Sequence, residues 1–204
     1  MLGSKILMKQ FQLNEDLLLR TYEISDASEL IELINDNRMY LRKWLPWLDQ
    51  NNELEDSEKF IQFTKTQLAQ GLGFICGIFF QGKLIGSCGY HLINESNLSV
   101  SLGYWLAESM TGKGIINRCV IFFIHYAFED LQLNKVLIEV GEKNLSSRAV
   151  CERLDLFNEG LERDAERLYG EYINRVRYSI LRSEWKKGWK PGREPNLVPV
   201  RTSR

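Results

Sequence analysis

Residues 99–117 read SVSLGYWLAESMTGKGIIN, and this stretch is the most informative part of the chain. A β-rich run enters a polar turn that holds Thr111, Gly112, Lys113 and Gly114, and the amphipathic segment IINRCVIFFIHYAFEDL follows at once. This order predicts a strand, a glycine loop and the start of a helix. Glycines without Cβ let a ligand approach the backbone, and the first helical N–H groups have no intrahelical partners. Such a helix end attracts phosphate.

The spacing of this loop excludes two families of phosphate-binding loops. A P-loop needs G-x-x-x-x-G-K-[ST], but Lys113 is followed by Gly114 and has no upstream glycine at the right distance. A dinucleotide fingerprint needs G-x-G-x-x-G, and position 117 is Asn where the third glycine should stand. Neither a nucleotide hydrolase nor a dinucleotide-dependent dehydrogenase is therefore indicated.

The remaining match is to the pyrophosphate loop of acyl-coenzyme A transferases. The run resembles motif A of the GNAT superfamily of N-acetyltransferases, Q/R-x-x-G-x-G/A, with Thr111 at the first position and Ile116 at the last. The ribosomal-protein N-terminal acetyltransferase branch of that superfamily often has Q-G-K-G-I at this place. Residues 112–115 match its last four letters.

Three flanking segments strengthen the resemblance to this branch. Residues 103–106 resemble its G-Y-W-L strand, residues 144–149 its N-x-x-S-x-A helix start, and LRKWLPWLD at 41–49 its early tryptophan loop. They occur in the right order, and the resemblance runs from about Leu13 to Trp185. One departure is Asp155, which stands where the family has a glycine at a left-handed helix end; Asp tolerates that backbone at modest cost.

Hydrophobic periodicity and turn residues predict a mixed α/β (α+β) chain in the order β-α-α-α-β-β-β-α-β-α-β-β. The predicted strands are 17–22, 73–80, 83–93, 99–106, 135–140, 157–163 and 172–181, with a tight turn at Gln81-Gly82. One predicted helix starts at a Ser25 or Asp26 cap and another at an Asp56 or Ser57 cap, with a short helix or loop between them at 41–49. Two further helices are predicted over 115–129 and 146–154.

The helix at 115–129 connects two strands that should lie side by side and parallel, 99–106 and 135–140. The resemblance implies the GNAT fold, a mostly antiparallel sheet flanked by helices in which these two strands splay apart to admit the coenzyme. The chain of 204 residues, 44% of them apolar, is long enough for one well-buried domain. We expect an N-terminal extension at 1–12, a single acetyltransferase domain at 13–185 and a flexible tail at 186–204, which is rich in Gly, Pro and charge.

Charge and hydropathy argue against two classes of partner. A net charge of −1 gives no electrostatic attraction for non-specific binding of nucleic acid. Apolar runs such as 120–127 fall far short of the ~20 residues that a membrane helix needs. The first ten residues do not resemble a secretory signal. We therefore expect a cytoplasmic protein without a membrane or nucleic-acid partner.

Cysteine and histidine spacing predicts no metal site. The four cysteines form no C-x-x-C pair, and reduced core thiols in a cytoplasm-like compartment are expected. The two histidines have no Cys or carboxylate partner at ligand spacing. These residues are Cys76, Cys88, Cys119, Cys151, His91 and His125.

Acetyl-CoA is the cosubstrate that the resemblance implies. The loop at 110–116 would hold its pyrophosphate through backbone N–H groups, with charge added by Lys113 or Arg118. The strand backbone around Trp105 would bind the pantetheine arm by strand-like hydrogen bonds. The predicted cofactor-binding residues are Trp105, Leu106, Met110, Thr111, Gly112, Lys113, Gly114, Ile115 and Asn144.

The resemblance also implies two catalytic residues. Asn144 is expected near the coenzyme arm and Ser147 near the sulfur, where the hydroxyl can donate a proton to the thiolate; capping of the helix is the structural alternative for either residue. Glu166, in the predicted turn RDAERLYGEY, corresponds to the carboxylate that faces the incoming amine and is the predicted proton acceptor. Alternatives are Glu139, Glu142, Glu108 or a chain of water molecules.

The acceptor pocket is expected to be aromatic. Trp44 and Trp47 flank Pro46 at a spacing that puts both on one face, where they form an apolar wall or a packed elbow. Tyr104 alternates with Trp105 on a strand and can line the acyl slot, or both can be core residues. Tyr169, with Tyr172, can complete the wall beside Glu166.

The sequence thus predicts an acetyl-CoA-dependent N-acetyltransferase whose acceptor is a protein N-terminal α-amine. A neutral amine attacks the thioester directly in a ternary complex, since no Cys, Ser or Lys is placed to form a covalent intermediate. One alternative acceptor is a small amine such as a polyamine, an aminoglycoside or an amino acid. Another interpretation is an acyl-CoA-binding sensor or partner module without turnover. Members of the family that the chain resembles are often dimers, and the resemblance therefore also suggests a homodimer whose contact is formed by the tail or the last strands.

Overall fold

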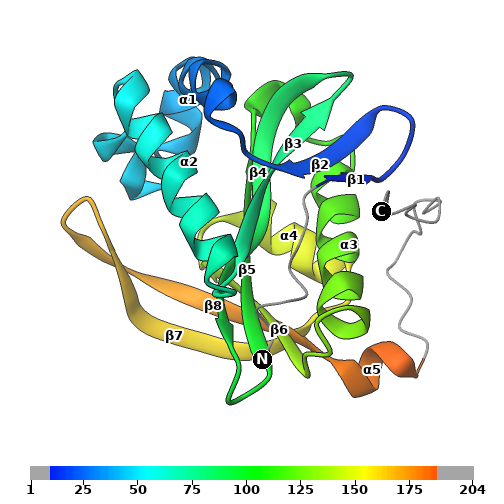
Figure 1. Ribbon diagram of the computed structural model, residues 1–204. Coiled ribbons are helices and arrows are strands. Elements are labelled where there is room, and N and C mark those ends of the chain that lie inside the picture. Colours follow the sequence, from blue (N-terminus) through cyan, green and yellow to red (C-terminus); the bar gives the residue numbers. More distant parts are fainter. Residues whose placement is uncertain (1–9, 188–204) are drawn as a thin grey trace.

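The computed structural model describes residues 10–187, and these residues build one eight-stranded sheet (Figure 1). The strand order is β1-β2-β3-β4-β5-β6-β8-β7, and every neighbouring pair is antiparallel except β5 and β6. The strands are β1 (Gln10–Gln12), β2 (Leu17–Thr21), β3 (Phe74–Phe80), β4 (Lys83–Asn94), β5 (Ser99–Leu106), β6 (Lys135–Gly141), β7 (Phe157–Leu168) and β8 (Glu171–Leu181). This confirms the predicted GNAT fold class.

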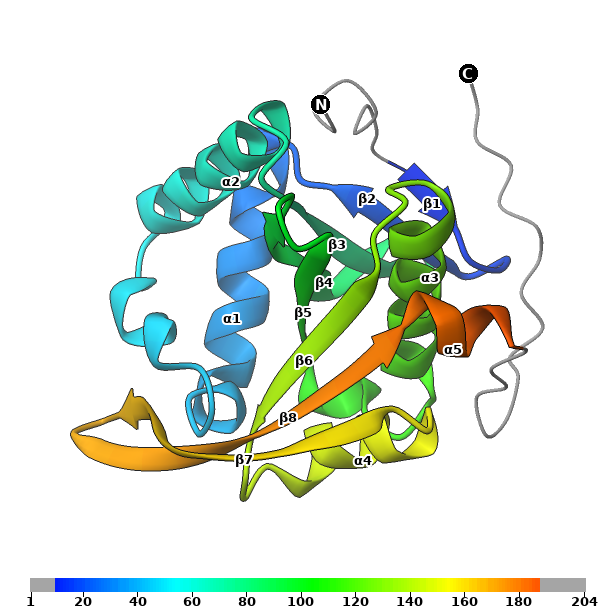
Figure 2. The same ribbon diagram turned by 90° about the horizontal axis from the view of Figure 1, so that it is seen from below.

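Helices cover both faces of the sheet (Figure 2). On one face, α1 (Ala27–Leu41) and α2 (Leu54–Ala69) pack on β4 and β3; on the other, α3 (Ile115–Glu129) and α4 (Leu145–Arg153) pack on β4 to β6. Each face has its own buried hydrophobic cluster. The shorter elements are α5 (Arg182–Lys186) and the 3-10 turns η1 (Ile24–Asp26), η2 (Pro46–Gln50) and η3 (Glu108–Met110).

The parallel pair β5 and β6 separates after three residues. Pairing runs from Ser99 opposite Lys135 to Ser101 opposite Leu137, and both strands continue beyond it without pairing to each other. Each strand leaves a stretch of its edge unpaired, and these stretches diverge around residues 103–106 and 138–141. The predicted splay of these two strands is therefore confirmed, and it opens the middle of the sheet.

Local chemistry explains the elements that were predicted correctly. Helix α3 has the predicted bounds, and its buried residues follow the apolar pattern that predicted it. Gln81 and Gly82 have φ of 50° and 79°, which is the backbone of a tight hairpin turn. Asp155 has φ of 53°, so it does take the left-handed conformation at the end of α4. All four cysteines are buried and free, as expected.

Several predicted bounds were wrong. Helix α2 begins at Leu54 rather than at an Asp56 or Ser57 cap, because Glu53 is the N-cap and forms a capping box with Asp56 at the third helical position. Strand β7 continues to Leu168, so Glu166 lies in the strand opposite Ile173 and not in the turn. Irregular pairing between Glu162 and Glu166 hides the strand's alternation.

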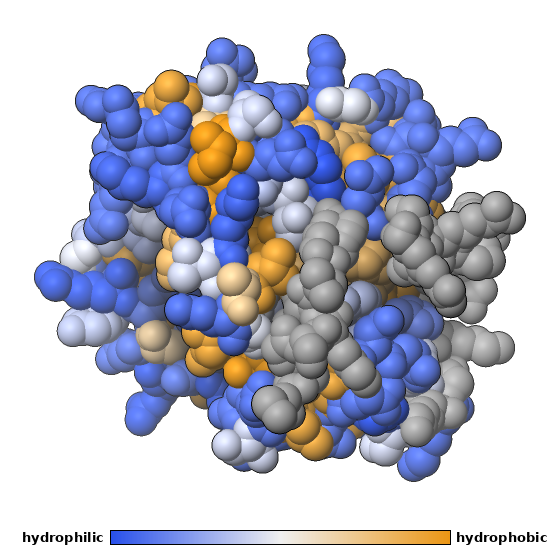
Figure 3. Space-filling view, viewed as in Figure 1, coloured by the Kyte–Doolittle hydropathy of each residue, from blue (hydrophilic) through white to orange (hydrophobic). Residues whose placement is uncertain are grey.

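Strand β1 and helix α5 were not predicted, because they are too short to show a hydrophobic period. The predicted N-terminal extension and tail lie mostly outside the described residues, at 1–9 and 188–204. Within residues 10–187, no helix is both long enough and apolar enough to cross a membrane. The face shown in Figure 3 is mostly hydrophilic, with hydrophobic side chains in separate groups.

Candidate active site

Two cavities meet where β5 and β6 separate. The first, of about 910 Å³, lies between the end of β5, the glycine loop, the start of α3 and helix α4. The second, of about 320 Å³, is lined by Phe60 of α2, Trp47 before it, and side chains of β4, β6, β7 and β8. Six residues line both cavities: Trp44, Leu45, Tyr104, Trp105, Asn144 and Ser147. Molecules bound in the two cavities would therefore contact each other at these residues.

The glycine loop has the geometry of an anion site. Gly112 and Gly114 have φ of 74° and 71°, in the left-handed region that favours glycine. A Cβ placed on either glycine would meet no atom within 4 Å, so the backbone there is open to a ligand. The first hydrogen bond of α3 runs from Arg118 N to Gly114 O, which leaves the amides of the first turn without intrahelical partners.

Charge near the loop comes from Arg118, which lines the first cavity. Lys113 does not line it; its Nζ lies 3.4 Å from Met110 Sδ and is exposed. Arg153, in the last turn of α4, is a second cationic lining residue that the sequence analysis missed. The other predicted cofactor residues line this cavity: Trp105, Leu106, Met110, Thr111, Gly112, Gly114, Ile115 and Asn144.

Ser147 is held between the start of α4 and strand β5. The Asn144 side chain caps the helix by accepting a hydrogen bond of 3.2 Å from Ser147 N. The hydroxyl of Tyr104 lies 3.0 Å from Ser147 Oγ and donates to Ser147 O at 3.2 Å. Burial raises the pKa of Tyr104 well above its usual value, so this phenol keeps its proton at neutral pH. Two hydroxyls thus share one hydrogen-bonded unit where the cavities meet.

Carboxylates gather on the second cavity. Glu166 and Glu139 line it, together with Arg175. The Arg175 guanidinium contacts Glu166 through Nε at 3.1 Å and through Nη2 at 2.9 Å, and both contacts are to Oε2. Glu139 pairs with Arg177 at 2.7 Å. The cavity therefore holds two acidic groups and one basic group on its wall.

The other two candidate carboxylates line neither cavity. Glu142 accepts a hydrogen bond of 2.9 Å from Asn174, and Glu108 is exposed in η3. Of the four glutamates that the sequence analysis considered, the structure brings only Glu166 and Glu139 to the acceptor side.

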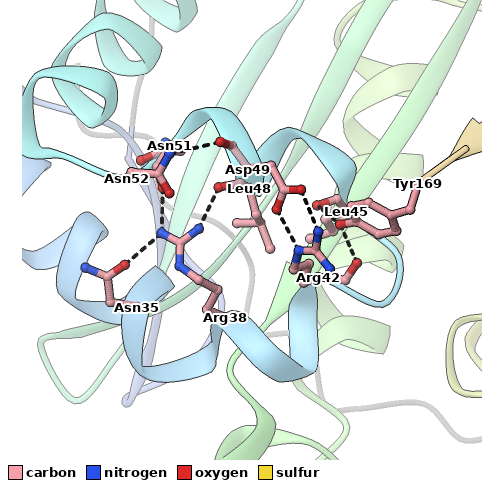
Figure 4. Close-up of polar contacts among 9 residues, drawn as sticks. All are labelled: Asn35, Arg38, Arg42, Leu45, Leu48, Asp49, Asn51, Asn52 and Tyr169. Atoms are coloured by element: carbon pink, nitrogen blue, oxygen red, sulfur yellow. Dashed lines mark hydrogen bonds and ion pairs between the residues drawn. The ribbon is translucent and has the colours of Figure 1, made fainter.

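Arg38 of α1 and Arg42, the C-cap residue of this helix, hold the tryptophan loop in place (Figure 4). Arg38 donates to the carbonyls of Leu48 and Asn51, both at 2.6 Å. Arg42 forms a bidentate pair with Asp49, with both contacts at 2.7 Å. These bonds hold the loop that carries Trp44, which lines both cavities, and Trp47, which lines the second.

Tyr169 contacts this loop from the β7–β8 hairpin and lines neither cavity. Its hydroxyl donates to Arg42 O at 2.6 Å, and the Arg42 guanidinium carbon lies 4.0 Å from the centre of its ring (Figure 4). Tyr172 is 65% exposed and is also absent from the cavity walls. Tyr169 therefore fastens the hairpin to the tryptophan loop instead of forming the wall itself.

No cluster of three metal-ligating side chains exists among the described residues. His125 packs edge-on against Trp185 at 5.1 Å between ring centres and lines neither cavity. His91 lines the second cavity, as does Arg175. Neither residue was predicted to lie in the acceptor pocket, because an isolated charge or histidine on a strand resembles an ordinary solvated side chain.

Comparison with protein families gives one match over most of the chain. The model described as an acetyltransferase (GNAT) domain matches residues 16–156. YdaF of Bacillus subtilis (strain 168), to which a ribosomal N-acetyltransferase role is assigned provisionally, is 37% identical over 177 residues, covering 86% of this chain and 96% of YdaF. The ribosomal-protein-serine acetyltransferase of Escherichia coli (strain K12) is 29% identical over 161 residues, covering 79% and 90%.

Two similar solved structures contain coenzyme ligands. RimL, a ribosomal L7/L12 α-N-protein acetyltransferase in complex with coenzyme A, has a TM-score of 0.80 and 26% identity, covering 85% of this chain and 98% of RimL. The microcin C7 self-immunity acetyltransferase MccE, in complex with acetyl-CoA and AMP, has a TM-score of 0.81 and 25% identity, covering 87% of this chain and 99% of that one.

Proposed function

The chain belongs to the GNAT acetyltransferase family, and we propose that it transfers the acetyl group of acetyl-CoA to the α-amine of a protein N-terminus. The observation that carries this proposal is the meeting of the two cavities at Tyr104 and Ser147. One cavity has an anion site at its far end, and the other has acidic and aromatic walls. This arrangement suits a donor with a diphosphate and an acceptor with a cationic amine.

The first cavity fits acetyl-CoA. Open backbone at Gly112 and Gly114 and the uncapped amides at the start of α3 would bind the diphosphate, with Arg118 adding positive charge. The unpaired edge of β5 at Trp105 and Leu106 offers backbone groups to the pantetheine arm. When bound, acetyl-CoA supplies an activated thioester. The two strands that separate beside it leave room for the acyl end to reach the second cavity.

Ser147 donates the proton that the leaving thiolate needs. In the proposed ternary complex, the amine nitrogen attacks the thioester carbon, the C–N bond forms and the carbonyl π electrons move to oxygen. When the intermediate collapses, the C–S bond breaks and the sulfur takes a proton from Ser147 Oγ. Tyr104, whose hydroxyl is within hydrogen-bond distance and is protonated at neutral pH, passes its proton to the Ser147 alkoxide and takes one in turn from water in the cavity, so that both hydroxyls are restored.

Glu166 receives the incoming amine. Both contacts from Arg175 are to Oε2, so Oε1 is left to accept a hydrogen bond from the incoming ammonium group. Trp44, Trp47 and Tyr104 form the apolar wall around the amine, which removes water from the reacting atoms. Tyr169 acts indirectly, by holding the loop that carries the tryptophans.

The relatives support a protein acceptor. The ribosomal-protein-serine acetyltransferase of E. coli and RimL are both named for ribosomal proteins. A ribosomal-protein substrate would place this enzyme in the cytoplasm, and a homodimer is part of the same proposal. Sedimentation of the full chain measures the oligomeric state.

One experiment identifies the acceptor. The full chain is incubated with acetyl-CoA and a cell extract from which it has been removed, and acetylated N-termini are mapped by mass spectrometry. In parallel, thiol release is followed with short peptides that begin with Ser, the residue named for the E. coli relative. A new N-terminal acetyl group on one protein supports the proposal, whereas acetylation of lysine side chains alone contradicts it.

A specific pair of rings favours a second candidate acceptor, a small amine that carries a flat ring. Trp47 and Phe60 line the second cavity with ring planes only 2° apart and centres 6.4 Å apart. Parallel aromatic faces bind planar groups by stacking, and MccE was solved with AMP. AMP should then inhibit acetylation of a peptide competitively if this candidate is correct, and should have no effect if only protein N-termini bind.

A further inference from the structure

His91 occupies an irregular position in the sheet, beside the acceptor cavity. On β4, Tyr90 pairs with Leu102 and Leu92 pairs with Ser101, so the residue between them has no partner on β5. This is a β-bulge, a device that re-aims a side chain. The Gln67 side chain donates a hydrogen bond to the carbonyl of His91 and so anchors the bulge to α2.

The imidazole lies close against the backbone of β5 at Gly103. A Cβ placed on Gly103 would be 2.0 Å from His91 Nε2 and 2.7 Å from its Cδ2, closer than any side chain allows. The ring can occupy this place only because residue 103 is glycine. Gly103 lines the second cavity, and it lies two residues before Trp105, which lines both cavities. The glycine of the G-Y-W-L strand therefore makes room for the imidazole.

The charged groups around this ring come from three other strands. His91 lines the second cavity with Glu139 of β6, Glu166 of β7 and Arg175 of β8. Desolvation by the surrounding protein, with a smaller effect from the positive charge of Arg175, lowers the pKa of His91 below its usual value. Within residues 10–187, neither ring nitrogen has a hydrogen-bond partner. The ring is therefore a neutral base with free lone-pair capacity.

We propose that His91 accepts the proton that the amine gives up during acetyl transfer. This inference rests on the proposed function and names the base for it. Glu166 holds the ammonium by charge; one N–H proton passes to the imidazole, directly or through one water molecule, and the neutral amine attacks the thioester carbon. His91 becomes an imidazolium and returns the proton to the solvent that reaches its exposed surface, and the second N–H proton, which the nitrogen gives up when the intermediate collapses, leaves by the same route.

An imidazole suits this step better than the carboxylate alone. Because desolvation lowers its pKa, the imidazole of His91 is neutral near neutral pH, and its lone pair is available to accept a proton. Glu166 is also engaged by two nitrogens of Arg175, a fixed positive charge that favours a role in holding the ammonium. The two residues then divide the work, with Glu166 binding the amine and His91 removing its proton.

The chain offers a matched control, because its only other histidine is His125, which packs on Trp185 away from both cavities. We compare wild type, His91→Asn and His125→Asn with a Ser-initiated peptide from pH 5.5 to 9. His91→Asn should lower kcat/KM about 100-fold at pH 7, which is typical for loss of a general base. The deficit should shrink above pH ~8, where the α-amine is already neutral. Acetyl-CoA affinity and His125→Asn kinetics should match wild type.

An unchanged pH profile in His91→Asn overturns this inference and leaves the proposed function standing, whereas a wild-type protein that acetylates no amine overturns both. If His91→Asn does not fold, an NMR titration of the wild-type imidazoles decides the question, with His125→Asn giving the assignment. The His91 resonance should titrate below pH 6.5 and should shift when the peptide binds. A resonance that does not respond to the peptide overturns the inference.

Discussion

The hydroxyl of Tyr104 lies 3.0 Å from Oγ of Ser147, at the point where the two cavities meet. Tyr104 lies near the C-terminal end of β5 and Ser147 in the first turn of α4, and the two residues are 43 positions apart in the chain. The N-cap of α4 sets the position of the serine, and the separation of β5 from β6 exposes the tyrosine. The proposed proton donor therefore depends on two elements, the first turn of α4 and the edge of β5.

Replacing Ser147 with Ala should lower kcat about 100-fold, because the thiolate loses its proton donor. Affinity for acetyl-CoA, measured by calorimetry, should stay within about twofold, since the diphosphate is bound elsewhere. Ser109→Ala, an exposed residue of η3, is the control and should be silent. Wild-type turnover in Ser147→Ala would show that this serine only caps or orients.

Tyr104→Phe should lower kcat about tenfold, a smaller loss than in Ser147→Ala, because Ser147 keeps its hydroxyl but loses a partner hydrogen bond worth about 1 kcal/mol. The double variant should be no slower than Ser147→Ala, as expected for two groups that act in one unit. Multiplicative losses in single-turnover rates would contradict the relay between the two hydroxyls.

Glu166→Gln should raise KM for a peptide amine about tenfold and leave acetyl-CoA affinity unchanged. The carboxylate that attracts the ammonium is lost, and the charge of Arg175 remains without its partner at 2.9 Å. Glu162→Gln is the matched control, since Glu162 lies on the same strand, pairs with Arg177 and lines neither cavity. Equal kinetics for the two variants would remove Glu166 from the acceptor site.

Much of this site could be predicted from the sequence because its parts are local. The glycine loop, the α3 start and the Asn144 cap each depend on residues within one turn, and the structure brings them to one cavity. The place of Glu166 in β7 could not be predicted, because the pairing with β8 is irregular and the alternation is lost. Tyr169 was predicted to lie in the pocket wall because its actual partner, Arg42, is 127 positions away in the chain, and a contact over that separation cannot be predicted from the sequence.

The residues that sequence reasoning missed act through long-range packing. His91 enters the acceptor cavity only because a bulge in β4 meets a glycine in β5, and neither feature marks a site by itself. Arg175 is one of many charges on the last two strands, and only the three-dimensional pairing places it beside Glu166.

Tyr169→Phe should raise KM for the acceptor about threefold, because one hydrogen bond that fastens the hairpin to the tryptophan loop is removed. The Kd of acetyl-CoA should not change. Tyr172→Phe, in the same hairpin and 65% exposed, is the control. A rise in the Kd of acetyl-CoA without a change in the KM of the acceptor would contradict this prediction, because Tyr169 would then affect the first cavity and not the second.

Asp26→Asn should destabilise the fold by about 2 kcal/mol, since the buried carboxylate accepts two hydrogen bonds of 2.6 Å from Arg20. Burial alone would raise the pKa of Asp26, but the hydrogen bonds from Arg20 and from the Glu23 backbone outweigh it, so the net pKa is lowered. This stabilisation is present above the unfolded value of about 3.9 and is lost as pH falls through the lower folded value.

Urea unfolding of wild type and Asp26→Asn between pH 7 and pH 3 measures this effect. The difference in the free energy of unfolding should be constant near neutral pH and should shrink in acid. A difference that grows as the pH falls would contradict the assigned direction.

The central claim is that backbone amides around Gly112 and Gly114 bind the diphosphate of acetyl-CoA, and calorimetric titration of the full chain with acetyl-CoA tests it most directly. We predict saturable heat at one site per chain for wild type, and a large loss of affinity in Gly114→Pro, which lacks the amide N–H and the positive φ. No saturable heat with wild type, or equal affinity in Gly114→Pro, would contradict the claim.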